Sequence, residues 1–407
     1  MSDNKNLKPG WKIRRFDQLA RQITERVDPT PEDSELYVGL EHMDPESLRI
    51  RRWGSQTDLI GTKFRMRKGD VLFARRNAYL KRVAIAPHDG LFSAHGMVLR
   101  PIRDAVLPDF LPFFMQSDVF MDRAVEISVG SLSPTINWKS MAGQEFALPP
   151  AEEQLRITEV LKGIDDLTES LAGAKEATER LKFSLTEDAF PVSEVRSYFG
   201  DPAAYGGRPL VRLGELASLQ VGFPFKSAEY SSAGDRLLRG SNVGVNRLIW
   251  DRDITCYWPT ERRLEVREYV LNAGDVVIAM DRPFIGEGFK IARVAEPDLP
   301  ALLLQRVGRF RLTERITSEY LWAFLHSESF KWQLQRMQKG TDLPHISKFD
   351  IEGTLIPALA IDNQLAIADS FAAVAAAEAS LEHRVNTNLK QKKVALHALI
   401  DRGARHV

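Results

Sequence analysis

Basic and amide side chains follow two similar strand-like segments of the chain, and side chains of these types can bind nucleic acid. In the first half, the segment from Asp70 to Phe73 is followed by Arg75, Arg76, Asn77, Tyr79, Lys81 and Arg82. In the second half, the corresponding loop contributes Arg282, Phe284 and Lys290. Arginine and lysine can pair with guanine and asparagine with adenine, while any of the cations can contact phosphate. These residues are therefore the first candidates for contacts with DNA.

The first cluster lies in the most basic part of the chain. Between Arg49 and Arg82 there are eleven basic residues against Asp58 and Asp70, and this segment also contains Arg65, Arg67 and Lys68. The whole chain has 55 basic and 55 acidic residues, so charge is concentrated here within a balanced protein. Such a segment is either a phosphate-facing surface or a solvated face of a strand-rich module. The second half has no equally basic segment, because the corresponding stretch from Arg262 to Arg293 contains six basic and five acidic residues.

The chain contains an internal duplication. Pro134 and Gln154 recur as Pro344 and Gln364, both 210 residues later, and the Gly69-Asp70 pair recurs as Gly274-Asp275 at an offset of 205. Repeated order indicates two similar modules related by a pseudo-two-fold axis, which suits the pseudo-symmetry of duplex DNA. The alternative is an ancient duplication whose loops have merely drifted. The paired glycine segments add candidates for contact with the DNA backbone, namely Ser131, Ser133, Lys339, Thr341 and His345.

Each module is predicted to be α+β. Strand-like runs are expected at 70–73, 82–86, 275–280 and 289–294, and helices or helix pairs at 107–124 and 318–337. The aromatic residues of 318–337 have mixed spacing and are expected in the core rather than on a surface that stacks bases.

A long amphipathic helix is expected after each module. The first carries apolar residues at alternating spacings of three and four, which is a heptad pattern: Val160, Ile164, Leu167, Leu171, Ala174, Thr178, Leu181 and Leu185. The second carries a looser stripe at Val374, Ala377, Leu381, Val385, Leu389, Leu396 and Leu399. One apolar stripe needs a partner helix, so the two are expected to pair antiparallel within the chain and to separate the modules. A homodimeric coiled coil is the alternative.

Composition narrows the class of protein. No apolar run approaches the length of about 18 residues that a membrane span needs, and the first ten residues do not look like a signal peptide. Cys256 is the single cysteine, which excludes an internal disulfide and fits a reducing cytoplasm. Neither a phosphate-binding loop nor a metalloprotease motif is present, so no catalytic residue, metal or cofactor is expected.

One motif of the second half is enzyme-like. Asp281-Arg282-Pro283-Phe284 after a strand is similar to the Asn/Asp-Pro-Pro-Tyr/Phe loop of amino-methyltransferases. Arg282 occupies the first proline position and no glycine-rich cofactor loop accompanies the motif, so methyltransferase activity is disfavoured.

The repeated pattern resembles the specificity subunits of Type I restriction–modification systems over essentially the whole chain. The resemblance is carried by Gly130-Ser131, by Leu148 to Ile157, and by a weaker copy ending at Asn363 to Ile367 that lacks the paired prolines. It implies two pseudo-repeated α/β target-recognition domains separated by two long helices that pair as an antiparallel coiled coil. The implied bounds are target-recognition domains at 1–150 and 191–358, a central helix at 151–190 and a C-terminal helix at 359–407.

The resemblance also implies partners. Each domain would bind one part of a bipartite, asymmetric site in double-stranded DNA. The helices would set the gap between the parts and dock two methyltransferase subunits, which restriction endonuclease–translocase subunits then join. A coiled-coil scaffold that does not bind DNA is the second hypothesis, and the basic segment argues against it.

Overall fold

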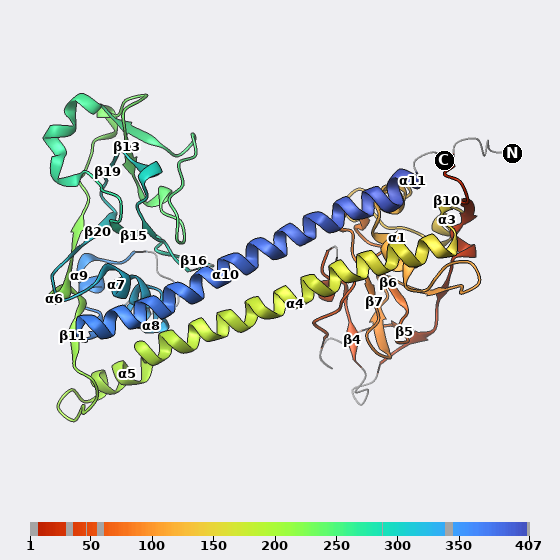
Figure 1. Cartoon of the computed structure of the whole chain (residues 1–407), viewed down its shortest axis with the longest axis horizontal. Coiled ribbons are helices and arrows are strands. Elements are labelled where there is room, and N and C mark those ends of the chain that lie inside the picture. Colours follow the sequence, from red (N-terminus) through yellow and green to blue (C-terminus); the bar gives the residue numbers. More distant parts are fainter. Residues whose placement is uncertain are drawn as a thin grey trace. The chain divides into compact units, whose positions relative to one another are not determined.

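The computed structural model describes residues 7–29, 36–45, 47–54, 61–286, 288–337 and 345–404. The chain forms two compact units, of which unit 1 comprises residues 1–174 and 381–407 and unit 2 comprises residues 175–380. Two long helices, α4 (Ala151–Ala189) and α10 (Ile361–Leu396), each contribute residues to both units (Figure 1). No helix in the described ranges is long and apolar enough to span a membrane.

Unit 1 is built on a four-stranded antiparallel sheet in the order β2-β9-β6-β7. A second sheet has the order β3-β5-β8-β4, and β1 pairs with β10 just before α4 begins. The strands are β1 Lys12–Arg15, β2 Ala20–Ile23, β3 Arg26–Val27, β4 Tyr37–Val38, β5 Lys63–Met66, β6 Val71–Phe73, β7 Val83–Ile85, β8 Gly90–Ser93, β9 Met97–Pro101 and β10 Glu145–Leu148. The helices are α1 Phe110–Gln116, α2 Asp118–Glu126 and α3 Trp138–Ala142.

Unit 2 repeats the main sheet in the order β12-β20-β15-β18, again antiparallel throughout. Its second sheet has three strands, β14-β13-β19, and a short hairpin pairs β16 with β17. The strands are β11 Leu210–Arg212, β12 Ala217–Val221, β13 Asp235–Leu238, β14 Cys256–Trp258, β15 Val276–Ala279, β16 Phe284–Ile285, β17 Gly288–Phe289, β18 Ile291–Arg293, β19 Ala301–Leu303, β20 Val307–Leu312 and β21 Leu355–Pro357. The helices are α5 Val192–Gly200, α6 Leu213–Leu216, α7 Ser318–Leu325, α8 Glu328–Met337 and α9 Lys348–Glu352. The main sheet is thus duplicated, while the second sheet differs between the units.

The repeated Gly-Asp pair has a structural role in both units. Gly69 and Gly274 have positive φ angles of 87° and 90°, so each turn adopts a conformation that glycine permits without strain. The Asp70 carboxylate then accepts two hydrogen bonds of 2.7 Å from Arg100 on β9. Asp275 is likewise 2.8 Å from Nη1 of Arg309, which is fully buried on β20. This motif therefore fastens two strands of the main sheet and does not face a ligand.

The repeated glutamines fix the starts of the long helices. The side chain of Gln154 accepts a hydrogen bond from the Leu107 amide and donates one to the Pro149 carbonyl, both 2.9 Å long. Gln364 makes the same pair of bonds with the Thr317 amide and the Leu359 carbonyl, also at 2.9 Å. The second helix start lacks the paired prolines, yet its buried glutamine makes the equivalent hydrogen bonds.

The helix pair keeps half of the contact face that the heptad pattern predicted on α4: Leu171 is buried, and Ile164, Thr178 and Leu185 are partly buried. Within unit 1, Nζ of Lys392 lies 2.7 Å from Asp165, and the Asn388 amide donates to Thr168 Oγ1 at 2.7 Å, so the helices run antiparallel as expected. Within unit 2, Lys182 lies 2.8 Å from Glu378. The contact face of α4 therefore includes Thr168 and Lys182.

The other half of the predicted positions on α4 is exposed, because that edge of the contact face runs one residue further along, through Leu161, Thr168, Lys175 and Lys182. Val160, Leu167 and Leu181 are each about half exposed, at 50%, 47% and 51%. Ala174 on α4 and Ala377 on α10 are exposed too, so their predicted places in the contact face were wrong. Lysine and threonine can occupy contact positions because their carbon atoms pack while their polar ends find partners on the other helix. Counting apolar residues misses such positions.

Both cores are aromatic and include the ends of the long helices. In unit 1 the buried Phe114 and Phe120 rings lie 5.8 Å apart, and Ile157 from α4 and Ile400 close the same core. In unit 2 Phe324 and Phe330 are equivalent at 5.4 Å, and Phe190 and Phe371 close that core. Ile400 belongs to a π-helical turn, His397–Asp401, which precedes α11 (Arg402–Ala404). The core position expected for the aromatic residues of α7 and α8 is confirmed for Tyr320, Phe324 and Phe330.

Candidate nucleic-acid interface

The candidate residues of unit 1 fall at two ends of strand β6. Val71 pairs with Ile85 and Phe73 with Val83, so the loop 74–82 is the tip of a hairpin. Arg67 and Lys68 are exposed but lie in the turn that enters β6, at the other end of that strand. Arg65 is part of β5 and its Nε lies 3.1 Å from Glu25. The basic segment is thus not one continuous surface.

The tip of this hairpin lies against the first glycine segment. The backbone N–H of Asn77 donates to the Pro134 carbonyl at 2.8 Å, and the backbone N–H of Ile136 donates to the Arg75 carbonyl at 3.0 Å. We call residues 74–82 together with 130–136 tip site 1. It brings together eight of the predicted residues: Arg75, Arg76, Asn77, Tyr79, Lys81, Arg82, Ser131 and Ser133.

Unit 2 has the same arrangement. The Ile346 amide donates to the Met280 carbonyl at 2.8 Å, and Asp281 and His345 form a β-bridge at the position that Arg76 and Thr135 occupy in unit 1. We call residues 279–286 and 288–290, together with 345–346, tip site 2. It contains the predicted Arg282, Phe284, Lys290 and His345, whereas Lys339 and Thr341 lie outside the described residues.

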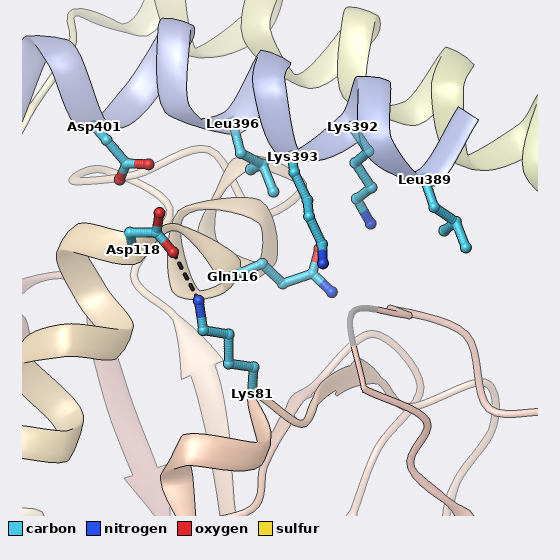
Figure 2. Close-up of a pocket in the computed structure, with 8 residues that line it drawn as sticks. All are labelled: Lys81, Gln116, Asp118, Leu389, Lys392, Lys393, Leu396 and Asp401. Carbon is cyan, nitrogen blue, oxygen red and sulfur yellow. Dashed lines mark hydrogen bonds and ion pairs between the residues drawn. The ribbon is translucent and has the colours of Figure 1, made fainter. Parts of the chain in front are cut away.

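Some side chains of tip site 1 serve the fold. Arg75 donates to the Ala94 carbonyl at 3.1 Å, and Arg82 donates to the Leu40 carbonyl at 2.9 Å. Burial lowers the pKa of Arg82 below its ordinary value. Lys81 Nζ lies 2.7 Å from Asp118 at the start of α2, beside residues of α10 (Figure 2). These three cations hold the loop in place.

Other side chains of tip site 1 point to solvent. Arg76, Tyr79 and Ser131 are exposed, and Ser133 is partly exposed. The Arg76 side chain makes no hydrogen bond or ion pair with any residue that the structure describes. Arg76 is therefore the cation of this site that is best placed to contact a phosphate.

Tip site 2 is less basic than tip site 1. Lys290 is partly buried, and that burial lowers its pKa. The Phe284 ring packs on the Phe289 ring at 5.3 Å, so Phe284 belongs to local packing. Sequence reasoning missed Arg306, whose Nη1 lies 3.2 Å from Asp281 Oδ1, the same atom that contacts His345 Nδ1 at 2.8 Å. Only the fold reveals Arg306, since it reaches this site from the turn before β20.

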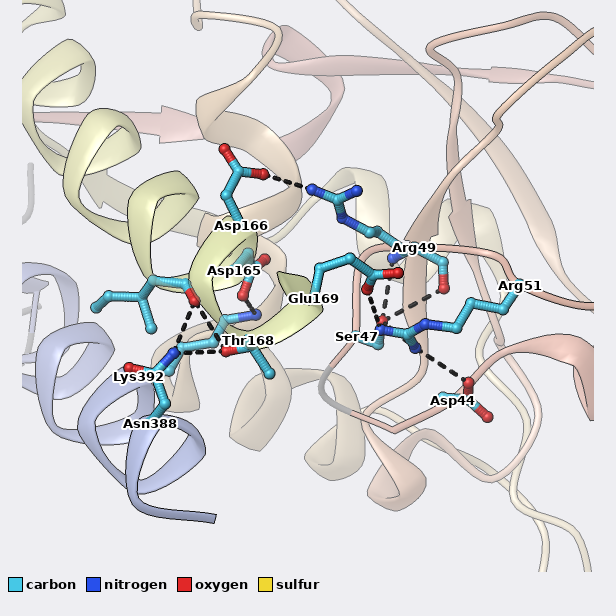
Figure 3. Close-up of polar contacts among 11 residues, drawn as sticks. Asp44, Ser47, Arg49, Arg51, Asp165, Asp166, Thr168, Glu169, Asn388 and Lys392 are labelled. Carbon is cyan, nitrogen blue, oxygen red and sulfur yellow. Dashed lines mark hydrogen bonds and ion pairs between the residues drawn. The ribbon is translucent and has the colours of Figure 1, made fainter. Parts of the chain in front are cut away.

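Three arginines of the basic segment face other parts of unit 1. Arg49 pairs with Asp166 and Arg51 with Glu169, and both acids are on α4 (Figure 3). Arg52 pairs with Asp44. Lys63 is buried, with Nζ 5.1 Å from the centre of the Tyr37 ring. The loop 47–52 therefore attaches the module to α4, and its charge is largely neutralised within the protein.

Comparisons with known proteins point to one family. Residues 61–180 match the model of the Type I restriction modification DNA specificity domain. The chain is 26% identical over 368 residues to the MjaVIII specificity subunit of Methanocaldococcus jannaschii, which covers 88% of this chain and 84% of that protein. It is 32% identical over 235 residues to the EcoAI specificity subunit of Escherichia coli, which covers 58% of this chain and 38% of that protein.

Solved structures share the fold. The S subunit of a Type I restriction–modification system from M. genitalium superposes with a TM-score of 0.60 at 15% identity, over 98% of both chains. A chain from a study of the assembly and conformational transition of the type I R-M system superposes with a TM-score of 0.57 at 22% identity, again over 98% of both chains.

Proposed function

Because the chain belongs to the family of Type I restriction–modification specificity subunits, we propose that its two modules each recognise one part of a bipartite, asymmetric DNA site. The chain is the DNA sequence-recognition subunit and is not itself an enzyme; methylation and cleavage belong to other subunits of the complex. The observation that carries the proposal is the repetition of one backbone frame with different side chains at tip sites 1 and 2. We assign the modules to residues 1–150 and 191–358.

The side chains at the two tips fit this division. Where tip site 1 has Arg76, Asn77 and Thr135, tip site 2 has Asp281, Arg282 and His345 at the equivalent β-bridge. Side chains that reach base edges supply specificity, while cations on phosphates supply affinity. Two frames with different side chains would therefore select two different half-sites.

The long helices, residues 151–190 and 359–407, are proposed to set the gap between the half-sites. Inserting one heptad into both helices should lengthen the preferred gap and leave both half-sites unchanged. An unchanged gap would exclude this role.

The helices are also proposed to dock two methyltransferase subunits, with endonuclease–translocase subunits joining that core. The exposed Val160, Leu167 and Leu181 recur every seven residues or two heptads along α4, and so form one stripe on its outer side. An apolar stripe left in water is a common mark of a protein interface. A reducing cytoplasm is the proposed location, which fits a chain with a single, partly buried cysteine, Cys256.

Module exchange tests the central proposal. Residues 11–150 would be replaced by the equivalent module of another specificity subunit, and methylation by the reconstituted complex would be mapped. One half of the recognised sequence should change and the other should remain. If both halves change, or neither, the assignment of one module to one half is wrong, and absence of any DNA selectivity would favour a scaffold.

A further inference from the structure

One pair of equivalent residues at the two tips shares an unusual backbone conformation. Asn77 has a φ of 56° and Arg282 a φ of 42°, both in the left-handed region. Asparagine tolerates this region moderately well, but a long side chain such as arginine is rarely found there. The two residues are 205 residues apart, the same offset as the Gly-Asp pairs that precede them. The strained conformation is thus a repeated feature of the tip and not an accident of one loop.

The surrounding backbone holds both residues in the same way. On one side, the residue two positions before each, Arg75 or Met280, accepts a hydrogen bond from an isoleucine amide of the facing segment. The residue directly before each also bridges to that segment, Arg76 to Thr135 and Asp281 to His345. Because both anchors are backbone contacts, the side chain at the strained position is free to differ between the modules.

A structural role alone does not explain these side chains. Glycine adopts a positive φ without strain. A larger side chain at such a position costs free energy, which indicates that the side chain has a role other than forming the turn. Within the described ranges, neither Asn77 nor Arg282 makes a side-chain hydrogen bond or ion pair. Arg282 is exposed, and the Asn77 Oδ1 atom lies buried without a partner, which favours any rotation that gives it one.

The chemistry of the two side chains indicates their ligands. An asparagine amide donates to N7 and accepts from N6 of adenine, and an arginine guanidinium donates to O6 and N7 of guanine. We propose, given the function above, that Asn77 selects an adenine in the half-site of module 1 and Arg282 selects a guanine in the half-site of module 2. Arg76 then contacts backbone phosphate beside Asn77.

Glycine substitutions separate base selection from folding. Asn77→Gly and Arg282→Gly would be made in the full-length chain, assembled with its methyltransferase subunits. Methylation would be measured on duplexes in which each base pair of the site is replaced in turn. Each variant should melt at the same temperature as the native chain or higher, because glycine relieves the strain. Each should also lose discrimination of about 5- to 150-fold at one position, an A·T pair for Asn77 and a G·C pair for Arg282.

Two further variants keep the test decisive. The exchange Arg282→Asn should convert the preference at that position from guanine to adenine, and asparagine tolerates the backbone conformation. Asn246→Gly is the matched control, since Asn246 also has a positive φ, 60°, but lies outside both tips. This control should leave every position unchanged.

The outcomes are distinguishable. Folded glycine variants that keep the native discrimination at all positions would overturn the assignment of these two residues while leaving the modules as DNA-binding units. A native complex that shows no bipartite selectivity would instead refute the proposed function.

Discussion

Lys392 of α10 and Asp165 of α4 form an ion pair of 2.7 Å, and the lysine side chain is only 3% exposed. Burial raises the pKa of Asp165, and Lys392 opposes that shift. Removing one partner of a buried pair leaves an uncompensated charge, so Asp165→Ala should lower the free energy of unfolding by about 3 kcal/mol. Replacing both residues by leucine should be neutral or stabilising. Urea unfolding of both variants checks this, with the exposed Asp166→Ala as control at under about 1 kcal/mol.

The buried Gln154 and Gln364 should matter equally to their two units. Gln154→Ala leaves the Leu107 amide and the Pro149 carbonyl without partners, so we expect a loss of about 1–3 kcal/mol in unfolding free energy. Gln364→Ala should cost a similar amount in unit 2. The partly exposed Gln144→Ala, measured in the same thermal melts, should change stability by less than about 0.5 kcal/mol. A glutamine variant indistinguishable from this control would show that water replaces the lost contacts.

His326 should make unit 2 sensitive to acid. Burial lowers the pKa of His326 to about 4, while Nδ1 bonds the Trp322 carbonyl at 2.7 Å. A folded-state pKa below the ordinary 6.5 means that the neutral ring stabilises the fold fully above pH 6.5, and that this contribution is lost as the pH falls toward 4. The loss should reach roughly 2 kcal/mol, since the side chain is partly exposed. His326→Gln should flatten the pH dependence of unfolding in this window, and an equally steep curve would assign the effect to carboxylates.

Arg76 and Arg75 should behave differently although they are neighbours. Arg76→Ala should reduce the slope of log affinity against log salt by about one, as expected for one lost phosphate contact. Arg75 bonds the Ala94 carbonyl, so Arg75→Ala should chiefly lower stability. Titrations of target DNA at several salt concentrations, paired with melting curves, separate the two effects. An unchanged slope for Arg76→Ala would place this side chain off the DNA.

The outer side of α4 should be needed for assembly but not for folding. Leu167→Asp puts a charge on an exposed position, so the chain alone should keep its melting temperature within a few degrees. Its affinity for the methyltransferase subunits should fall at least tenfold if the stripe is buried in the complex. Ser370→Asp, at an exposed polar position of α10, is the control. If the Leu167→Asp variant still assembles fully in size-exclusion chromatography, this surface is not part of the interface.

The sequence predicted the duplication, two strands of each main sheet (β6 and β7, β15 and β18) and the helices α1–α2 and α7–α8, because those features rest on repeated residues and regular spacing. It misplaced part of the helix contact face, because Thr168 and Lys182 pack there through their carbon atoms and pair across the helices. It joined Arg49, Arg51 and Arg76 into one basic segment, because proximity along the chain does not reveal that Asp166 and Glu169 on α4 would pair with the first two. Arg306 escaped notice because the fold alone brings it to Asp281.

Unit 1 is made from both ends of the sequence, and Leu396 and Ile400 complete its core. During synthesis these two residues emerge from the ribosome after the whole of unit 2. Unit 2 is one continuous segment of the sequence, so it can fold while the chain is still growing, whereas the N-terminal module must wait with an open apolar face. Chaperones that bind nascent chains should therefore bind this subunit on its N-terminal half.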